Sequence, residues 1–97
     1  MRFVVVFEDS PSMAEVRRSL EPQHLKFLEE HHAEILMAGG LRERHDGAYV
    51  GGLWVVEVVN RARAVELIER DPYYVACPRK YQLLAWGKAL PHRQVLM

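Results

Sequence analysis

His24 is the residue of this sequence that is best suited to acid/base chemistry. The segment around it has the spacing of an amphipathic helix, whose apolar stripe contains Met13, Val16, Leu20, Phe27 and His31. At 100° per residue, His24 falls near the centre of that stripe, where a leucine would be ordinary. Histidine changes charge between about pH 5 and 8, so it can exchange protons at neutral pH. Three roles are open for His24: a structural residue bonded to a backbone carbonyl, a general acid or base, and a metal ligand.

Asp71 is the carboxylate that we expect to orient His24. It stands at the end of a predicted helix, and Pro72 directly after it restricts its backbone. A catalytic imidazole needs a partner on one ring nitrogen, which fixes its tautomer and stabilises its protonated form. An aspartate before proline is also an ordinary way to end a helix. His24 and Asp71 are therefore predicted as the catalytic residues, with a structural role as the alternative.

A substrate is predicted to contact Gly39, Tyr73 and Trp86. The glycine pairs at residues 39–40 and 51–52 do not open helices, so they are not phosphate-binding loops. They permit bulges or close backbone approach, which can leave room for a ligand over a sheet. The aromatic residues expected either in the core or around the pocket are Tyr73, Tyr74, Tyr81 and Trp86.

Neither a metal nor another cofactor is predicted. His31 and His32 are adjacent, so they point in different directions on a helix, and the spacing typical of metal ligands is lacking around them. Cys77 lies in a connector without a motif that would mark a reactive thiolate.

Three charged residues each have two interpretations. Arg17 and Arg18 can bind an acidic substrate, although exposed arginines on a helix are ordinarily solvated. Glu57 interrupts an apolar strand face, so we expect it either in the pocket or in an interface between subunits.

Four strands are expected to carry these residues. They are predicted at residues 2–8, 33–38, 50–59 and 80–87, from their β-branched and aromatic composition and their alternation. Gly39-Gly40 is expected to end the second strand, and Asp46-Gly47 is typical of a hairpin turn before the third.

The helices follow from their boundary signals. Ser12 and Glu15 fit a capping box at the start of the first helix, and Asn60 is expected to cap a second helix that ends near residue 70. Pro22 either kinks the first helix or begins a new segment, which would place His24 near a helix N-terminus. Residues 73–78 form a connector with room for one helical turn.

The order of these elements, β-α-β-β-α-β, predicts an α+β, ferredoxin-like fold with a four-stranded antiparallel sheet. Right-handed crossovers place both helices on one face of that sheet. The strands are apolar on their other face too, which would leave a large exposed patch on a monomer. We therefore predict a homodimer in which two such sheets pack face to face.

Composition limits the class of protein. The 97 residues predict a single domain over residues 1–97, and 13 basic residues balance 13 acidic ones. This neutrality favours neither nucleic acid nor an anionic membrane as a partner. The apolar run at residues 3–7 is too short for a signal peptide or a membrane span. One cysteine, Cys77, is compatible with the reducing cytoplasm, which is the predicted location.

Four short motifs, in order, resemble the YciI-like (YCII-related) family. They are Pro22-x-His24-Leu25, Leu36-Met37-Ala38-Gly39, Gly52, and the segment from Ala64 to Asp71-Pro72-Tyr73. The resemblance covers most of the chain. It implies a dimeric α+β barrel and a catalytic histidine–aspartate pair that matches His24 and Asp71. One relative is a dehydrochlorinase acting on an aromatic ring, and similar barrels include muconolactone isomerases and small monooxygenases.

Two positions depart from the family pattern. Glu21 stands where relatives often have arginine, and Cys77-Pro78 occupies the neighbourhood of a frequent glycine. Both bear on which substrate is accepted.

The leading hypothesis is a small metal-independent enzyme of lyase or isomerase type, dehydrochlorinase-like, that acts on a small organic molecule. His24 would transfer the proton and Asp71 would orient it. The alternatives are a non-catalytic ligand-binding or accessory module and a cofactor-free oxygenase.

Overall fold

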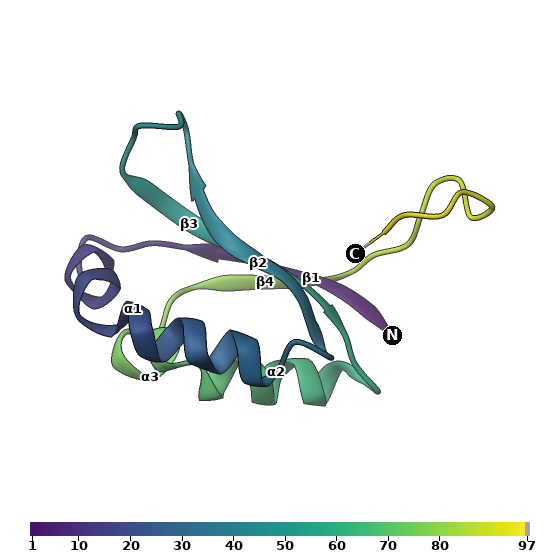
Figure 1. The fold of residues 1–97 in the computed structure, drawn as a ribbon, viewed down its shortest axis with the longest axis horizontal. Coiled ribbons are helices and arrows are strands. Elements are labelled where there is room, and N and C mark those ends of the chain that lie inside the picture. The colour runs from purple at the N-terminus through teal and green to yellow at the C-terminus, as the bar shows by residue number, and fades with distance from the viewer. Residues whose placement is uncertain (97) are drawn as a thin grey trace.

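A four-stranded antiparallel sheet carries helices on one face (Figure 1), in a computed structural model that describes residues 1–96. The elements are β1 (Arg2–Glu8), α1 (Met13–Glu30), β2 (Ile35–Arg42), β3 (Tyr49–Glu57), α2 (Arg61–Arg70), α3 (Pro72–Ala76) and β4 (Tyr81–Ala85). The strand order is β2-β3-β1-β4, and β1 pairs antiparallel with both β3 and β4. The ferredoxin-like α+β protomer is thereby confirmed.

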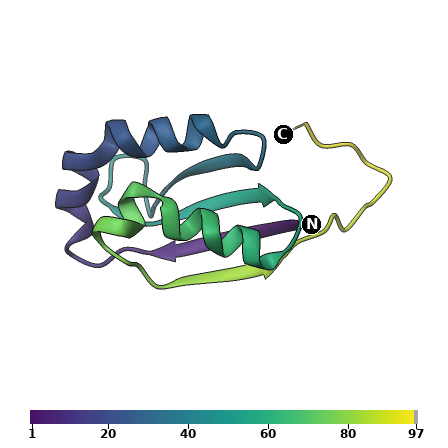
Figure 2. The same cartoon turned by 90° about the horizontal axis from the view of Figure 1, so that it is seen from below.

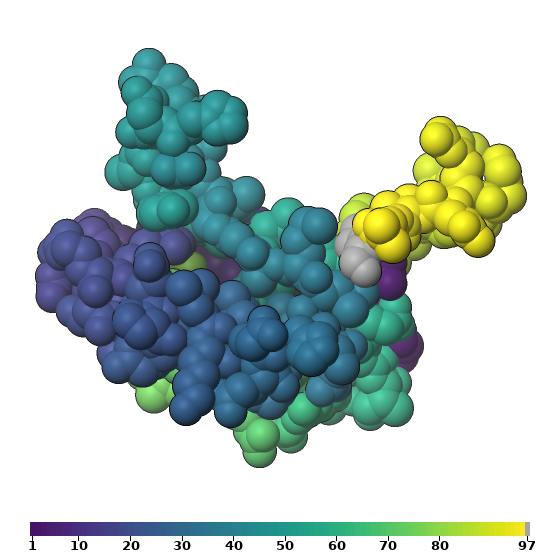
Figure 3. All heavy atoms as spheres, viewed as in Figure 1, coloured from purple at the N-terminus to yellow at the C-terminus, as the bar shows by residue number. Residues whose placement is uncertain are grey.

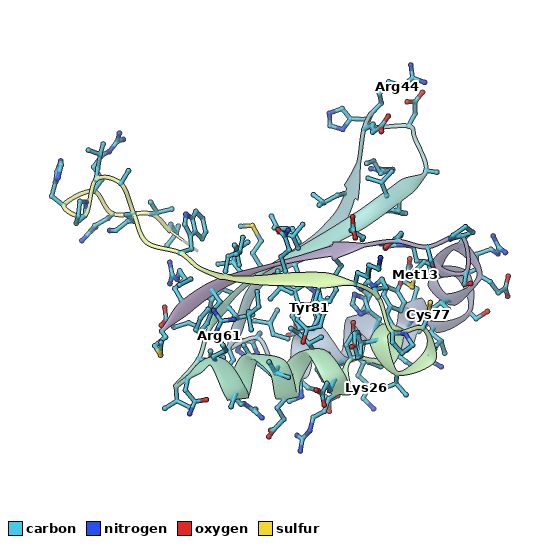
Figure 4. All side chains as sticks on the ribbon, turned by 180° about the vertical axis from the view of Figure 1, so that it is seen from behind. Met13, Lys26, Arg44, Arg61, Cys77 and Tyr81 are labelled. Atoms are coloured by element: carbon cyan, nitrogen blue, oxygen red, sulfur yellow. The ribbon has the colours of Figure 1, made fainter. Side chains whose placement is uncertain are left out.

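The helix-facing side of the sheet carries the core. In β1, Phe3, Val5 and Phe7 are buried, whereas Val4 and Val6 are only partly covered. The same core contains Trp54, Val56, Leu67 and Ile68. Each such side chain contributes about 1.5–3 kcal/mol when it is fully buried. Figure 2 shows α1 and α2 side by side over the sheet, and Figure 4 shows Tyr81 between β4 and the helices.

The opposite side of the sheet is open. Met37 and Leu84 on this side are 54% and 49% exposed. The β2–β3 hairpin, with Arg44 at its tip, and the chain after β4 both project beyond this side (Figures 1 and 4). Figure 3 shows a broad hollow between these two projections. Within residues 1–96, no helix combines the length and apolar character needed to cross a membrane.

The first helix is continuous, so of the two alternatives for Pro22 the kinked helix is confirmed and the new segment is not. Pro22 lies inside α1, and Figure 2 shows the helix changing direction between its first turns and its later ones. Proline lacks an N–H and crowds the preceding turn, which accounts for a bend without a break. His24 therefore lies within the helix, two residues after the proline, and not at a helix N-terminus.

The predicted capping box is also wrong. Ser12 has helical backbone angles (φ −65°, ψ −21°), and within residues 1–96 its side chain makes no capping hydrogen bond. Glu15 instead accepts hydrogen bonds from Arg18 and Ser19, one turn further along the helix. Glu15 thus bonds to side chains within α1 and not to the backbone at the start of the helix.

The boundaries of the second helix are as predicted. The side chain of Asn60 accepts a hydrogen bond from the backbone N–H of Arg63 at 2.9 Å, and α2 ends at Arg70. Asp71 then serves as the N-cap of α3, because its Oδ1 accepts from the backbone N–H of Tyr73 at 3.3 Å.

The glycine pairs lie inside strands, so the prediction that Gly39-Gly40 ends the second strand is wrong. β2 continues to Arg42 because Gly39 and Gly40 keep their ladder partners, Leu53 and Gly52, on β3. The chain turns at residues 43–48 before β3 begins, as the sequence predicts.

Gly51 is the glycine whose lack of a side chain matters most to the sheet. A Cβ atom there would overlap the carbonyl oxygen of Phe7 on β1. We therefore expect Gly51→Ala to force β1 and β3 apart and to lower the free energy of unfolding by about 1–3 kcal/mol, measured by urea denaturation. Gly87→Ala is the matched control, because no atom lies within 4 Å of the added Cβ. Equal stability of the two variants would contradict this account.

Candidate active site

His24 and Asp71 are in direct contact although 47 residues separate them. Nδ1 of His24 lies 2.6 Å from Oδ1 of Asp71. His24 comes from α1, on the C-terminal side of the bend, and Asp71 from the junction of α2 and α3. The packing of these helices on one face of the sheet brings the two side chains together.

Asp71 is fully buried, with 0% of its surface exposed. Its Oδ1 accepts from His24 and from the backbone N–H of Tyr73, while Oδ2 has no hydrogen-bond partner within residues 1–96. A carboxylate without water around it interacts strongly with its one neighbouring imidazole. The arrangement can therefore stabilise an imidazolium at His24.

The ring of His24 is fixed on two sides. Since the carboxylate can only accept, Nδ1 is the nitrogen that donates, and Nε2 remains for a ligand. The ring of Tyr73 stacks on the imidazole with 3.8 Å between centroids and 6° between planes. Such aromatic pairs contribute about 0.5–1.5 kcal/mol beyond the area they bury. The imidazole is thus held in one tautomer and one orientation.

Burial raises the pKa of the Tyr73 phenol. Arg17 opposes this shift, Glu21 and Asp71 add to it, and Arg79 opposes it again. The phenol therefore stays protonated at neutral pH and is not a second base in the pocket.

A pocket of about 130 Å³ lies beside His24, between α1 and the β2–β3 part of the sheet. The helix contributes Arg17, Glu21, His24, Leu25 and Leu28 to its lining. The strands contribute Ala38, Gly39, Gly40, Tyr49, Gly52 and Trp54, and Tyr73 and Arg79 complete it. Small residues on the helix-facing side of β2 and β3 leave this space open.

Two arginines in this pocket share one carboxylate. Arg17 donates from Nε and Nη2 to Asp9 at 3.0 and 3.3 Å, and from Nη2 to the carbonyl of Gly51 at 2.9 Å. Arg79 donates from Nη1 to the same Asp9 at 3.0 Å and is only 6% exposed. Its guanidinium lies over the ring of Phe7, with 4.3 Å to the centroid.

The predicted substrate contacts divide into two groups. Gly39 and Tyr73 line the pocket, but Trp86 does not. Trp86 follows β4 and pairs its backbone with Arg2 at the other end of β1, where it is 48% exposed. Trp86 therefore lies outside this pocket, because the direction of β4 carries it away from His24.

Other candidate residues lie outside the pocket. Glu57 pairs with Arg2 at the end of β3, and Cys77 lies 3.7 Å from the hydroxyl of Ser10. Arg18 pairs with Glu15 on the exposed side of α1. Within residues 1–96, no three histidine, cysteine, aspartate or glutamate side chains gather in a way that could hold a metal ion.

Sequence reasoning missed Asp9 and Arg79. Asp9 directly follows β1, and polar residues are ordinary at the end of a strand. Only its contact with Arg17, which the sequence does not reveal, distinguishes it. Arg79 sits in a connector next to Lys80, where an exposed cation is the usual outcome.

The fold and the pocket define a ferredoxin-like α+β protein in which a partly exposed histidine contacts a buried aspartate beside a helix–sheet pocket. The chain belongs to the YCII-related (YciI-like) family, because the family model of the YCII-related domain matches residues 1–88. A comparison with curated protein sequences gave no significant match.

One solved structure with the same fold is the 5-chloro-2-hydroxyhydroquinone dehydrochlorinase from Burkholderia phenoliruptrix AC1100, in complex with 2,5-dihydroxybenzoquinone. The TM-score is 0.79 at 23% sequence identity, and the match covers 90% of this chain and 94% of that one. At this level of identity the likeness shows the fold.

The contact with Asp71 fixes which nitrogen of neutral His24 carries the proton. We expect long-range ¹H–¹⁵N NMR spectra to show the Nδ1–H tautomer, whereas histidines in water prefer Nε2–H. Asp71→Ala removes the acceptor and should return His24 to Nε2–H, while the exposed His45 serves as an internal reference. An Nε2–H tautomer in the unmodified protein would refute the assigned geometry.

Proposed function

We propose that this protein is a small-molecule enzyme that works by general acid/base proton transfer. The observation that carries the proposal is the 2.6 Å contact between Nδ1 of His24 and the fully buried Asp71, beside a pocket. His24 would take a proton from the substrate through Nε2, the nitrogen that the carboxylate leaves free. Asp71 would hold the ring and stabilise the imidazolium that forms.

The reaction type that fits these groups is a lyase or isomerase reaction. After Nε2 removes a proton from carbon, the same imidazolium can return it to another carbon, or the electron pair can expel a leaving group. The family membership and the dehydrochlorinase with the same fold support this class of chemistry. The predicted absence of a metal and the cytoplasmic location remain parts of the same proposal.

The protein would act as a homodimer through the open sheet faces. Support comes from the exposed apolar residues of that face and from the hollow between the two projections in Figure 3. On each strand the apolar residues of this side include Val4, Val6, Met37, Leu53 and Leu84. A patch of this kind is unusual on a soluble monomer.

The catalytic proposal is tested by incubating the protein with a panel of small cyclic and carboxylated carbon acids. In D₂O, ¹H NMR detects exchange and isomerisation, and chloride release detects turnover of 5-chloro-2-hydroxyhydroquinone. We expect His24→Gln to lower turnover by about 10²–10⁴-fold, the usual contribution of a general base. Asp71→Asn should lower turnover as well, because the amide no longer stabilises the imidazolium.

The control is His45→Gln, which changes an exposed histidine at the hairpin. Circular dichroism establishes that each variant is folded. If His24→Gln turns over every substrate as fast as the unmodified protein, the proposal fails. Binding of a panel compound that is never converted would favour the non-catalytic ligand-binding module. Loss of stability in both dyad variants, with ligand affinity and turnover unchanged, would identify the pair as structural.

The dimer is tested by light scattering at micromolar concentration, where we expect twice the mass of one chain. Leu84→Glu places a charge on the open sheet face that forms the proposed interface and should weaken the dimer at least about tenfold, because the carboxylate would be desolvated without a partner. Val59→Glu is the control, since Val59 lies outside the sheet and is 78% exposed. A monomeric mass for the unmodified protein would refute the dimer.

A further inference from the structure

We propose that Arg17 and Arg79 form a binding site for an oxyanion of the ligand, either a carboxylate or an enolate or phenolate oxygen, in the same pocket as His24. This inference names the class of substrate for the proposed function. The binding of an anion does not depend on that function, whereas the reaction step described below rests on it. It stands on the geometry of two guanidinium groups that the proton-transfer pair does not use.

Arg17 is held along one edge of its guanidinium, and the ring of Tyr49 covers one face, with 4.3 Å between Cζ and the ring centroid. Its Nε and Nη2 are engaged by Asp9 and the carbonyl of Gly51. Its Nη1 has no hydrogen-bond partner within residues 1–96 and lies 3.4 Å from the point that a Cβ of Gly40 would occupy. A rigidly held guanidinium whose Nη1 makes no hydrogen bond in the described residues is suited to receive an anionic oxygen.

Arg79 is the more unusual of the two. Its side chain is 2% exposed, and its Nε is buried without a hydrogen-bond partner in the described part of the chain. Its Nη1 lies 3.5 Å from the Cβ position of Gly52, another pocket residue without a side chain. A buried cation with an unmet donor costs stability, and this cation belongs to the lining of the pocket.

The charges of the pocket are separated. On the arginine side, two cations face the single carboxylate of Asp9, which leaves one net positive charge. On the other side lies the carboxyl group of Asp71, in contact with His24. Glu21 adds a further negative charge at the exposed mouth. An anionic group of a ligand is therefore attracted to the arginine side of the pocket.

This separation matches the charge that develops when a carbon acid is deprotonated. The C–H bond breaks, and the proton goes to Nε2 of His24. The electron pair forms a carbon–carbon double bond, and the carbonyl π electrons move to the oxygen, which becomes an enolate. Arg17 and Arg79 then stabilise that oxygen as an oxyanion, the role of preorganised donors in acyl transfer. The substrate class is a small carbonyl compound with an adjacent acidic C–H, or its phenolic equivalent.

Benzoate and benzamide are the probes that test this site, since they have nearly the same shape and differ in charge. Affinities are measured by isothermal titration calorimetry and by NMR titration. We expect benzoate to bind at least about tenfold more tightly than benzamide, the usual value of a charge-assisted hydrogen bond. Benzoate should also shift the Nε–Hε signals of Arg17 and Arg79 and leave that of Arg18 unchanged.

Arg17→Met and Arg79→Met replace each cation with an uncharged side chain of similar length. Each should reduce the preference for benzoate to about threefold or less, whereas Arg18→Met, one residue along the helix and exposed, should keep it. A purely structural role would lower both affinities together and leave the preference unchanged, which would overturn the proposal. If a variant does not fold, the arginine signals of the unmodified protein decide: no shift with benzoate, or equal binding of the two probes, overturns the proposal.

His24→Gln separates this inference from the proposed catalysis. The variant retains both arginines, so it should keep the preference for benzoate whether or not the protein turns over any substrate. In the unmodified protein, preference for benzoate without turnover of any panel compound would support the oxyanion site and favour the non-catalytic ligand-binding module over the enzyme. Turnover without any preference would refute the oxyanion site and leave the acid/base pair intact.

Discussion

The Oδ1 atom of Asp71 is the point on which the arrangement of the pocket depends. It accepts hydrogen bonds from His24 on α1 and from the backbone of Tyr73 at the start of α3, so one atom joins two helices and caps one of them. Because the carboxylate is fully buried, its charge acts on the imidazole without screening by water. The ring of Tyr73 completes the support by stacking on the same imidazole.

The pocket beside this pair is open because several positions on the sheet lack a large side chain. Ala38 and Gly52 stand where larger side chains would close the gap between α1 and the strands. On the same face, Trp54 at the edge of the pocket and Phe7 next to it fill the layer and contact each other edge to face. One surface of the sheet thus serves both as a packed core and as the floor of a cavity. Large side chains fill the core, and small side chains leave the cavity open.

The order of strands and helices could be predicted because it depends on local signals, among them the Asn60 cap and the proline after Asp71. The approach of His24 to Asp71 follows from the same signals, since this order of elements places both crossovers on one face. Arg79 could not be predicted in this way. Its burial depends on a carboxylate 70 residues earlier in the chain, and such a contact leaves no periodic pattern in the sequence.

The bend in α1 has a consequence for the dimensions of the pocket. Arg17 lies before Pro22 and His24 after it, seven residues apart, which corresponds to about 10.5 Å along a straight helix. Because the helix changes direction between them, the separation of the cation from the base is set by the angle of the backbone as well as by residue spacing. The bend at Pro22 therefore helps to determine how long a ligand can be if it is to reach both Arg17 and His24.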